Sequence, residues 1–165
     1  MIEKAYFAGG CFWCITPTFK ETEGVISVVS GYSGGDEAFP SYELVKSQKT
    51  GHRETVLVEY DGEKVGFEAL LEIFLCGVDL SDAEGQFIDR GHSYTLAVYF
   101  TDEEQKRTTE ERIGQIEEES GQKVYVSIEP YKSFYPAEEE HQDYYLKHPE
   151  EFEKELIESG RKQTL

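Results

Sequence analysis

Cysteine is scarce in this chain of 165 residues: there are three, an odd number, which excludes a complete disulfide framework. Basic residues are also few, 16 against 34 acidic ones, and the net charge is -18. Because such a surface repels phosphates and anionic lipids, we expect neither nucleic-acid nor membrane partners. The sequence also lacks an apolar run long enough to span a bilayer and a signal-peptide pattern, which favours a reduced, cytoplasmic setting.

The length and composition that are present favour a globular domain. A chain of this size buries roughly 70% of its unfolded surface, which is enough for a core without disulfides. Aromatic residues make up 13% of the chain, with 11 Tyr and 10 Phe, and this favours a folded domain with a pocket over a disordered segment. We therefore expect one domain over residues 1–165, acting as a monomer.

Hydrophobic periodicity predicts the order of the elements. Strands are predicted over residues 4–8, 25–32, 55–60, 94–100 and about 124–128. The first helix is predicted from about Phe12 or Trp13 to 21 or 22, and Pro17 favours a start at Trp13 or Cys14, because proline fits only the first turn. Further helices are predicted over 67–76, from a Thr101 cap to Ser120, and over about 137–147 and 150–159. The first six elements run β-α-β-β-α-β, the order of a split βαβ, ferredoxin-like unit. The predicted class is α+β: a two-layer sandwich of a mixed sheet with helices packed on it, and a C-terminal helical and loop extension.

The most distinctive stretch is Ala8-Gly9-Gly10-Cys11-Phe12-Trp13-Cys14, which follows the first predicted strand and opens the first predicted helix. At a helix N-terminus, free N–H groups and the helix dipole favour a thiolate, so we expect Cys11 to be a nucleophile. Cys14 lies three residues on, on the same helical face, and a modest local shift brings the pair within reach of a disulfide.

Three interpretations of this cysteine pair compete: a buried inert pair, a metal site and a redox-active dithiol. A structural metal site needs about four ligands. The chain has one further Cys and four His, none with paired ligand spacing. The glycines and aromatics around the pair disfavour an inert role. The redox dithiol is therefore the preferred interpretation, and no metal is expected.

Further motifs resemble the peptide methionine sulfoxide reductase A family, and they occur in the family's order over most of the chain. The matching stretches are Gly9–Cys14, Gly31–Gly35, Gly51–Glu54, Asp89–Tyr94, Phe134–Glu138 and His141–Tyr145. The resemblance implies a reductase for the S epimer of methionine sulfoxide, free or in proteins, since one enzyme class serves each epimer. It also implies no cofactor beyond an external dithiol, with thioredoxin as the expected partner.

The resemblance also implies roles for single residues. Cys11 is expected to attack the sulfoxide sulfur, and Glu54 to be the acid. Tyr32 and Tyr94, both placed at strand ends, are expected to bind the sulfoxide oxygen, with Asp89 orienting contacts beside them. Independently, Glu54 shares strand parity with the apolar residues Val56, Val58 and Tyr60, so it points inward and burial is expected to raise its pKa. The alternative is a strand-edge carboxylate in water.

Two aromatic residues are expected to bind the substrate methyl group. The resemblance gives this role to Phe12 and Trp13, and sulfur–aromatic contacts favour it; the alternative is ordinary core packing. After attack, Cys11 is expected to become a sulfenic acid that Cys14 converts to a disulfide. Cys76 is the other candidate resolving residue, interpreted here as a core thiol, because the tail over 159–165 has no cysteine.

The sequence departs from the family at three places: the segment 78–82, His92 and Thr95. We expect these positions at the pocket rim, where they affect substrate preference more than chemistry. Two other functions stay open from the residues alone. One is a thiol–disulfide oxidoreductase acting on protein disulfides, and the other is a redox-sensing or metal-binding module.

Overall fold

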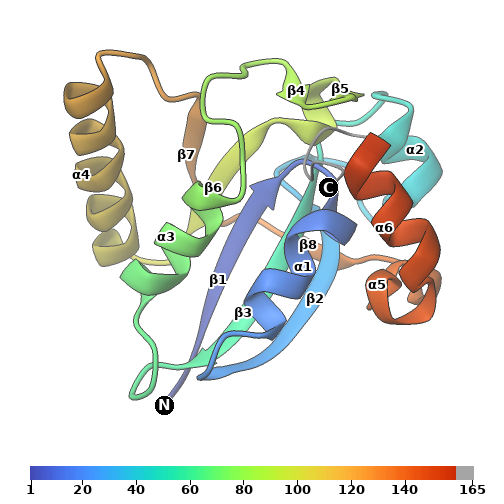
Figure 1. Cartoon of the computed structure of the whole chain (residues 1–165), viewed down its shortest axis with the longest axis horizontal. Coiled ribbons are helices and arrows are strands. Elements are labelled where there is room, and N and C mark those ends of the chain that lie inside the picture. Colours follow the sequence, from blue (N-terminus) through green and yellow to red (C-terminus); the bar gives the residue numbers. More distant parts are fainter. Residues whose placement is uncertain (159–165) are drawn as a thin grey trace.

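The computed structural model describes residues 1–158, arranged as a curled mixed sheet with helices around it (Figure 1). The strands are β1 (Ile2–Gly9), β2 (Val25–Ser33), β3 (Arg53–Asp61), β4 (Gly85–Gln86), β5 (Asp89–Arg90), β6 (Leu96–Phe100), β7 (Val126–Pro130) and β8 (Phe134–Pro136). The helices are α1 (Phe12–Lys20), α2 (Tyr42–Lys46), α3 (Phe67–Cys76), α4 (Glu103–Ser120), α5 (Tyr144–Lys147) and α6 (Pro149–Glu158). Two short 3-10 turns are η1 (His92–Tyr94) and η2 (Glu139–His141).

The main sheet has six strands in the order β7-β6-β1-β3-β2-β8. The pairs β1–β3, β1–β6, β2–β3 and β2–β8 are antiparallel, whereas β6 and β7 are parallel and are connected through α4. Strands β4 and β5 form a separate small hairpin. The architecture is therefore α+β, as the sequence predicts.

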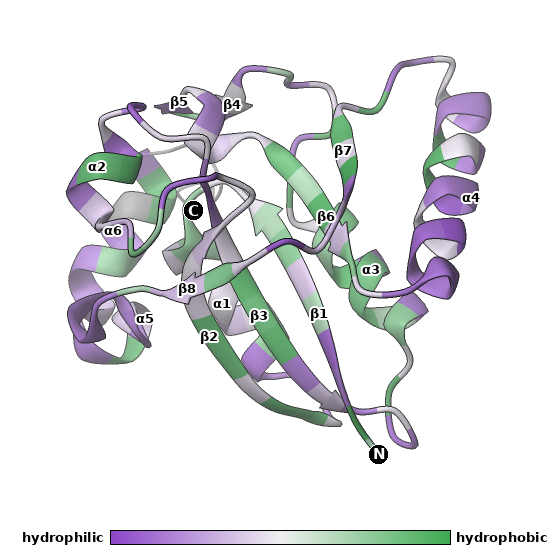
Figure 2. Cartoon of the chain, turned by 180° about the vertical axis from the view of Figure 1, so that it is seen from behind, coloured by the Kyte–Doolittle hydropathy of each residue, from purple (hydrophilic) through white to green (hydrophobic). Residues whose placement is uncertain are grey.

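The sheet must curl strongly, because its two edge strands are joined by a very short connection. β7 ends at Pro130 and β8 begins at Phe134 on the opposite edge. Four residue steps span at most about 14 Å, whereas five strand spacings in a flat sheet are about 24 Å. Figure 2 shows this segment passing across the back of the central strands. There Tyr131 stacks on Tyr6 of β1, with ring centroids 4.5 Å apart.

The core lies mainly between the sheet and the helices α1 and α3. Phe7 of β1 stacks against Phe19 of α1 and Phe74 of α3, with ring centroids 5.3 and 5.1 Å apart. The sheet's other face carries a smaller cluster around Tyr6 and Tyr99. Because side chains of a strand alternate between faces, each strand contributes to both layers.

Several expected boundaries differ from the structure. The first helix begins at Phe12, one of the two expected starts, and contains Pro17, so the later start that Pro17 favoured was wrong. Asp102, and not Thr101, caps α4, because its carboxylate accepts a hydrogen bond from the Gln105 backbone N–H at 2.8 Å. Tyr94 belongs to the 3-10 turn η1 and not to the strand that follows it.

Other expectations are confirmed. α4 ends at Ser120, and Gly121 after it has a φ of 68°, the left-handed conformation of a C-terminal stop. Figure 2 shows α4 as largely hydrophilic, as its thin apolar content predicts. The predicted helix over 137–147 is in fact η2 followed by α5. The predicted end of the last helix at Ser159, and the cysteine-free tail to 165, lie outside the described residues. None of the helices among residues 1–158 has the length and apolarity that crossing a membrane requires.

Candidate active site

Cys11 sits at the turn between β1 and α1, at the end of the sheet where α2, α6 and the β4–β5 hairpin gather (Figure 1). The chain reverses at Gly10, whose φ of 90° is a conformation that favours glycine. Cys11 is the N-cap residue of α1 and is 8% exposed. The sequence prediction that this cysteine opens a helix is therefore confirmed.

The side chains of the cysteine pair are in contact, and neither cysteine is in a disulfide. A hydrogen bond with Cys14 is the main cause that raises the pKa of the Cys11 thiol well above its usual value, followed by burial and by the negative charges of Cys14, Glu54 and Asp89. The expected lowering of this pKa by the helix N-terminus was therefore wrong for the substrate-free protein. Tertiary structure brings acidic groups around the sulfur that local sequence does not reveal.

Glu54 lies directly beside the cysteine turn. It is the second residue of β3, is 1% exposed, and its Oε1 accepts a hydrogen bond of 3.2 Å from the Phe12 backbone N–H in the first turn of α1. Its other oxygen, Oε2, is buried and has no hydrogen-bond partner among the described residues. Buried polar atoms without partners are rare in folded proteins and call for an explanation.

The environment keeps this carboxyl group protonated at neutral pH. Burial is the main cause that raises the pKa of Glu54 to about 8; the Phe12 N–H opposes the rise, while the charges of Asp89 and Cys14 add to it. A hydrogen bond with the Tyr94 side chain, the smallest of these causes, also opposes the rise. The predictions that Glu54 points inward and that burial raises its pKa are confirmed. A strand-edge carboxylate in water is excluded.

Tyr32 lies opposite Glu54 in the register of β2 and β3. The ring is fully buried, and its hydroxyl donates a 2.8 Å hydrogen bond to Glu138 Oε1. Burial, followed by this hydrogen bond and the charge of Glu138, raises the pKa of Tyr32 above its usual range. In the substrate-free protein the Tyr32 proton is therefore directed at Glu138.

Tyr94 reaches the same site from η1. It is 7% exposed, and its pKa is raised by burial first and then by the charges of Glu54, Tyr42 and Asp89. Asp89, at the start of β5, is half-buried and raises the pKa of Cys11, Glu54 and Tyr94 alike. The structure thus brings all the expected polar site residues to one region.

The two aromatics after Cys11 occupy different environments. Phe12 is fully buried and packs in the core. Trp13 is half-buried, and its indole stacks on Tyr144 with ring centroids 4.1 Å apart and on His141 at 5.6 Å. Its Nε1 is buried without a hydrogen-bond partner in the described part of the chain.

The sequence prediction missed the aromatic residues that complete this wall. His141 stacks on Tyr42 at 4.1 Å, and Tyr42 also stacks on Trp13 and Phe12 at 5.9 and 6.2 Å. The motif over His141–Tyr145 was a signal for two of these residues, but no role was assigned to it. For Tyr42, which comes from a short helix in a segment without periodicity, the sequence carries no comparable signal.

A cavity of about 320 Å³ lies beside Cys14. Its lining includes Cys14 and apolar side chains of α1, α3 and α6, among them Phe19, Phe74 and Phe152. Cys14 thus faces this cavity while it also contacts Cys11. Cys76, at the end of α3, is exposed, so its interpretation as a core thiol was wrong.

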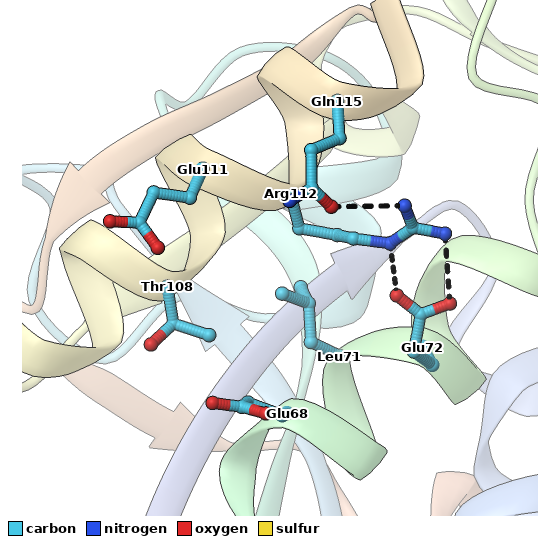
Figure 3. Close-up of a pocket in the computed structure, with 7 residues that line it drawn as sticks. All are labelled: Glu68, Leu71, Glu72, Thr108, Glu111, Arg112 and Gln115. Carbon is cyan, nitrogen blue, oxygen red and sulfur yellow. Dashed lines mark hydrogen bonds and ion pairs between the residues drawn. The ribbon is translucent and has the colours of Figure 1, made fainter. Parts of the chain in front are cut away.

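Two other features of the molecule are possible binding sites: a second cavity and a group of possible metal ligands. A cavity of about 230 Å³ between α3 and α4 contains a paired Arg112 and Glu72, and it includes none of the predicted site residues (Figure 3). Within residues 1–158, one group of possible metal ligands has its atoms within 4.8 Å of one another: Glu138, Glu140 and His141. Both Glu138 oxygens already accept hydrogen bonds, from Tyr32 and from the Tyr42 backbone.

The departures from the family pattern lie close to the site, but not all on its substrate side. Thr95 accepts a hydrogen bond of 2.8 Å from Arg53, whose side chain is on the opposite face of the sheet from Glu54. His92 contacts the Gly51 carbonyl at 3.0 Å. In the segment 78–82, the Asp82 carboxylate pairs with Arg90 of β5. Thr95 therefore helps to hold the sheet and does not form a substrate rim.

Comparison with known proteins agrees with this arrangement. The sequence model described as peptide methionine sulfoxide reductase matches residues 3–165. Peptide methionine sulfoxide reductase MsrA 2 of Staphylococcus aureus is 46% identical over 162 residues, covering 97% of this chain and 92% of that protein. MsrA of Halalkalibacterium halodurans is 45% identical over 163 residues, with the same coverage.

Solved structures show the same fold. Reduced Mxr1 from Saccharomyces cerevisiae has a TM-score of 0.85 at 25% identity, covering 90% of this chain and 87% of that one. A further structure of Mxr1, in complex with Trx2, has a TM-score of 0.58 at 16% identity, covering 87% and 84%, and this likeness shows the fold alone. The match over nearly the whole chain and the identity of the curated relatives show that this chain belongs to the MsrA family of peptide methionine sulfoxide reductases.

Proposed function

We propose that this chain reduces methionine-S-sulfoxide, free or in oxidised proteins, to methionine, with Cys11 as the nucleophile and Glu54 as the acid. The observation that carries the proposal is the buried Oε2 of Glu54, which has no partner among the described residues. A carboxyl that is protonated at neutral pH, because its pKa is raised to about 8 by burial, has a proton to give. In the proposed reaction, the sulfoxide oxygen accepts the proton of the Glu54 carboxyl group.

The reaction begins with attack of the Cys11 sulfur on the sulfoxide sulfur. Glu54 protonates the sulfoxide oxygen, which becomes more basic as its bond to sulfur weakens. The oxygen passes to Cys11 as a sulfenic acid, Cys11 loses two electrons, and methionine leaves as the sulfide. Because the pKa of the Cys11 thiol is raised in the substrate-free protein, the thiol proton must leave as the new bond forms, and the Glu54 carboxylate, which has just given up its own proton, takes it.

Tyr94 and Tyr32 are proposed to donate hydrogen bonds to the sulfoxide oxygen, and Asp89 to orient contacts beside them. For Tyr32 this requires that its hydroxyl leave Glu138, to which it donates in the substrate-free protein. Phe12 and Trp13 are proposed to bind the methyl group. The buried position of Phe12 supports a role as the floor of that pocket, and the half-buried indole of Trp13 supports a role as its wall.

Cys14 is proposed to resolve the sulfenic acid. Its thiol attacks the Cys11 sulfur, a disulfide forms and water leaves. The contact between the two side chains supports this step, because it raises the pKa of Cys11 more than any other cause. An external dithiol then reduces the disulfide. Thioredoxin is the proposed reductant, and the Mxr1 structure with Trx2 supports a partner of that kind for a protein of this fold.

The proposal also covers the cofactor, the cellular setting, the domain organisation and the finer description of the fold. No cofactor is required beyond the dithiol, and the setting is cytoplasmic, with a single domain over residues 1–165 acting as a monomer. A ferredoxin-like arrangement of the central sheet is supported by the strand order β6-β1-β3-β2 and by its antiparallel pairs. In this order the first and third strands of the unit are neighbours, as a split βαβ requires.

The test uses dithiothreitol and racemic methionine sulfoxide, and follows both diastereomers by chromatography. We expect loss of the S form only, and no loss with Cys11→Ser. Persistence of both forms with the wild-type protein would refute the proposal.

A matched pair of variants tests resolution with thioredoxin as the reductant. Cys14→Ser is expected to stop multiple turnover while sparing the first turnover, and Cys76→Ser is expected to leave both intact. Full thioredoxin-dependent turnover by Cys14→Ser would show that Cys14 does not resolve the intermediate.

A further inference from the structure

Gln48 has an unusual backbone conformation for its residue type. It lies between α2 and β3 with a φ of 67°, in the left-handed region that glycine adopts without strain. Such strain persists only where the surrounding structure compensates for it. The contacts of the Gln48 side chain are the candidates for this compensation.

The Gln48 side chain holds Ser93, the middle residue of η1, at two points. Its Oε1 accepts a hydrogen bond of 3.0 Å from the Ser93 backbone N–H, and its Nε2 donates one of 2.7 Å to Ser93 Oγ. Nε2 also donates to the Lys46 carbonyl at 3.1 Å, which fixes the amide from its other side. Ser93 is 1% exposed, so water does not compete freely for these bonds.

The stem of Gln48 also packs against Gly91, the residue immediately before η1. A Cβ on Gly91 would lie only 2.6 Å from Gln48 Cδ, and the φ of Gly91 is 116°. The side chain thus fills the space that the missing Gly91 side chain leaves. Gln48 therefore contacts η1 by packing as well as by hydrogen bonds.

Tyr94 follows Ser93 directly, and η1 is a single turn of three residues. Within this turn, the backbone of Tyr94 is held by its N–H, which donates to the Gly91 carbonyl at 3.0 Å. A turn this short has little stability of its own and depends on contacts from outside. We propose that Gln48 is a positioning residue for Tyr94: it holds η1 so that the Tyr94 hydroxyl is aimed at the reacting oxygen.

This inference rests on the proposed function and names a residue that acts on the reaction through Tyr94. Gln48→Gly removes the side chain while accepting the backbone conformation, and Gln48→Asn keeps an amide that tolerates this conformation but is too short to reach Ser93. In single-turnover reduction of methionine sulfoxide we expect both variants to be slower by about tenfold, since a misplacement of about 1 Å can cost on the order of 100-fold. KM should change less than kcat, because the contact strengthens in the transition state.

A double-variant cycle separates positioning from general damage. In a Tyr94→Phe background, Gln48→Gly should slow the reaction by less than about twofold, because the hydroxyl that it positions is gone. Gln122→Gly, which removes an exposed glutamine in the loop before β7, is the matched control and should leave the rate unchanged. An equal slowing in both backgrounds, or none in the wild-type background, would overturn the inference.

Hydrogen exchange tests the clamp without any enzyme assay. The Ser93 amide proton should exchange at least about tenfold faster in both Gln48 variants, since its acceptor is lost. If the Ser93 amide exchanges faster in the variants but the wild-type protein does not reduce methionine sulfoxide, the clamp stands and the proposed function is refuted instead. Unchanged exchange of Ser93 would refute the clamp itself.

Discussion

Arg53 and Glu54 are consecutive residues of β3, both buried, and they face opposite sides of the sheet. Arg53 has partners for its charge and its donors: its Nε donates to Thr95 Oγ1, and its Nη1 donates to the Tyr99 hydroxyl at 3.0 Å and to Glu129 at 2.6 Å. Glu54 accepts a hydrogen bond from the cysteine turn at Oε1, and its Oε2 has no hydrogen-bond partner among residues 1–158.

Arg53 and Glu54 therefore show two roles that a buried ionisable side chain can have. A satisfied buried group contributes to the stability of one conformation, whereas an unsatisfied one costs free energy that folding alone does not repay. On the Arg53 side the sheet is closed by its own hydrogen bonds. On the Glu54 side a buried carboxyl oxygen lacks such a bond within residues 1–158. Variants on the two faces should therefore affect different properties.

The largest expected effect is on catalysis at the unsatisfied face. Glu54→Gln keeps the shape of the side chain but cannot give up a carboxyl proton, so single-turnover reduction should slow by about 10² to 10⁴-fold at pH 7. Glu59→Gln, on the same strand but away from the site, serves as the control and should match the wild type. A Glu54→Gln rate within threefold of wild type would show that the carboxyl proton is not used.

The second effect is the pH dependence of stability. The pKa of Glu54 is raised to about 8, mainly by burial, from an ordinary value of 4.5. Between these values the native state keeps a proton that the unfolded state has lost, so the free energy of unfolding falls as pH rises, by on the order of 3 kcal/mol at pH 7. Below pH 4.5 both states are protonated and this loss disappears.

Urea unfolding of the wild type and of Glu54→Gln at several pH values measures this contribution. The stability of the variant relative to wild type should grow from about pH 5 to pH 8. A difference that stays constant over this window would mean that Glu54 titrates alike in the folded and unfolded chains.

The third effect is on stability at the satisfied face. Arg53→Met removes the partner of Glu129 and of two hydroxyl groups, and the free energy of unfolding should fall by about 2 kcal/mol, less than for a fully enclosed ion pair because Glu129 reaches water. Urea unfolding checks this value. A combined Arg53→Met and Glu129→Leu variant should recover part of the loss, and a loss below about 0.5 kcal/mol for Arg53→Met would remove the contrast between the two faces.

The smallest effect is that of a single hydroxyl group on the same face. Tyr99 accepts from Arg53 and donates to the Ser33 carbonyl at 3.3 Å. Tyr99→Phe should lower the free energy of unfolding by about 1 kcal/mol and leave the single-turnover rate unchanged. If Tyr99→Phe also slows the reaction, the two faces of the sheet are coupled, and the proposed contrast between them is wrong.

Local sequence signals were sufficient for part of the site. The glycines before Cys11 predicted the turn, and the alternation along β3 predicted that Glu54 points inward, because both properties depend on a few neighbouring residues. The i, i+3, i+4 pattern of α3 also excludes Cys76 from its buried face, so its exposure was predictable, although the residue was interpreted as a core thiol.

The rest of the site depends on residues far apart in the sequence. The hydrogen bond with Cys14, three residues away, is the main cause of the raised pKa of Cys11, but the burial of the thiol and the nearby Glu54 and Asp89 depend on tertiary structure. The wall around Trp13 comes from Tyr42, His141 and Tyr144, and the clamp on η1 comes from Gln48. No local pattern fixes such pairs. The strong curl of the sheet also follows only once the two edge strands are known.

The order of these parts along the chain has a consequence for biosynthesis. The cysteine turn is made well before two of the three rings that stack on Trp13, because His141 and Tyr144 come 130 or more residues later, and only Tyr42 comes early. At about 5 to 20 residues per second, a ribosome needs roughly 10 s to supply those two later rings. During that interval the nascent chain carries both thiols of the cysteine turn without His141 and Tyr144, so its aromatic wall is complete only late in synthesis.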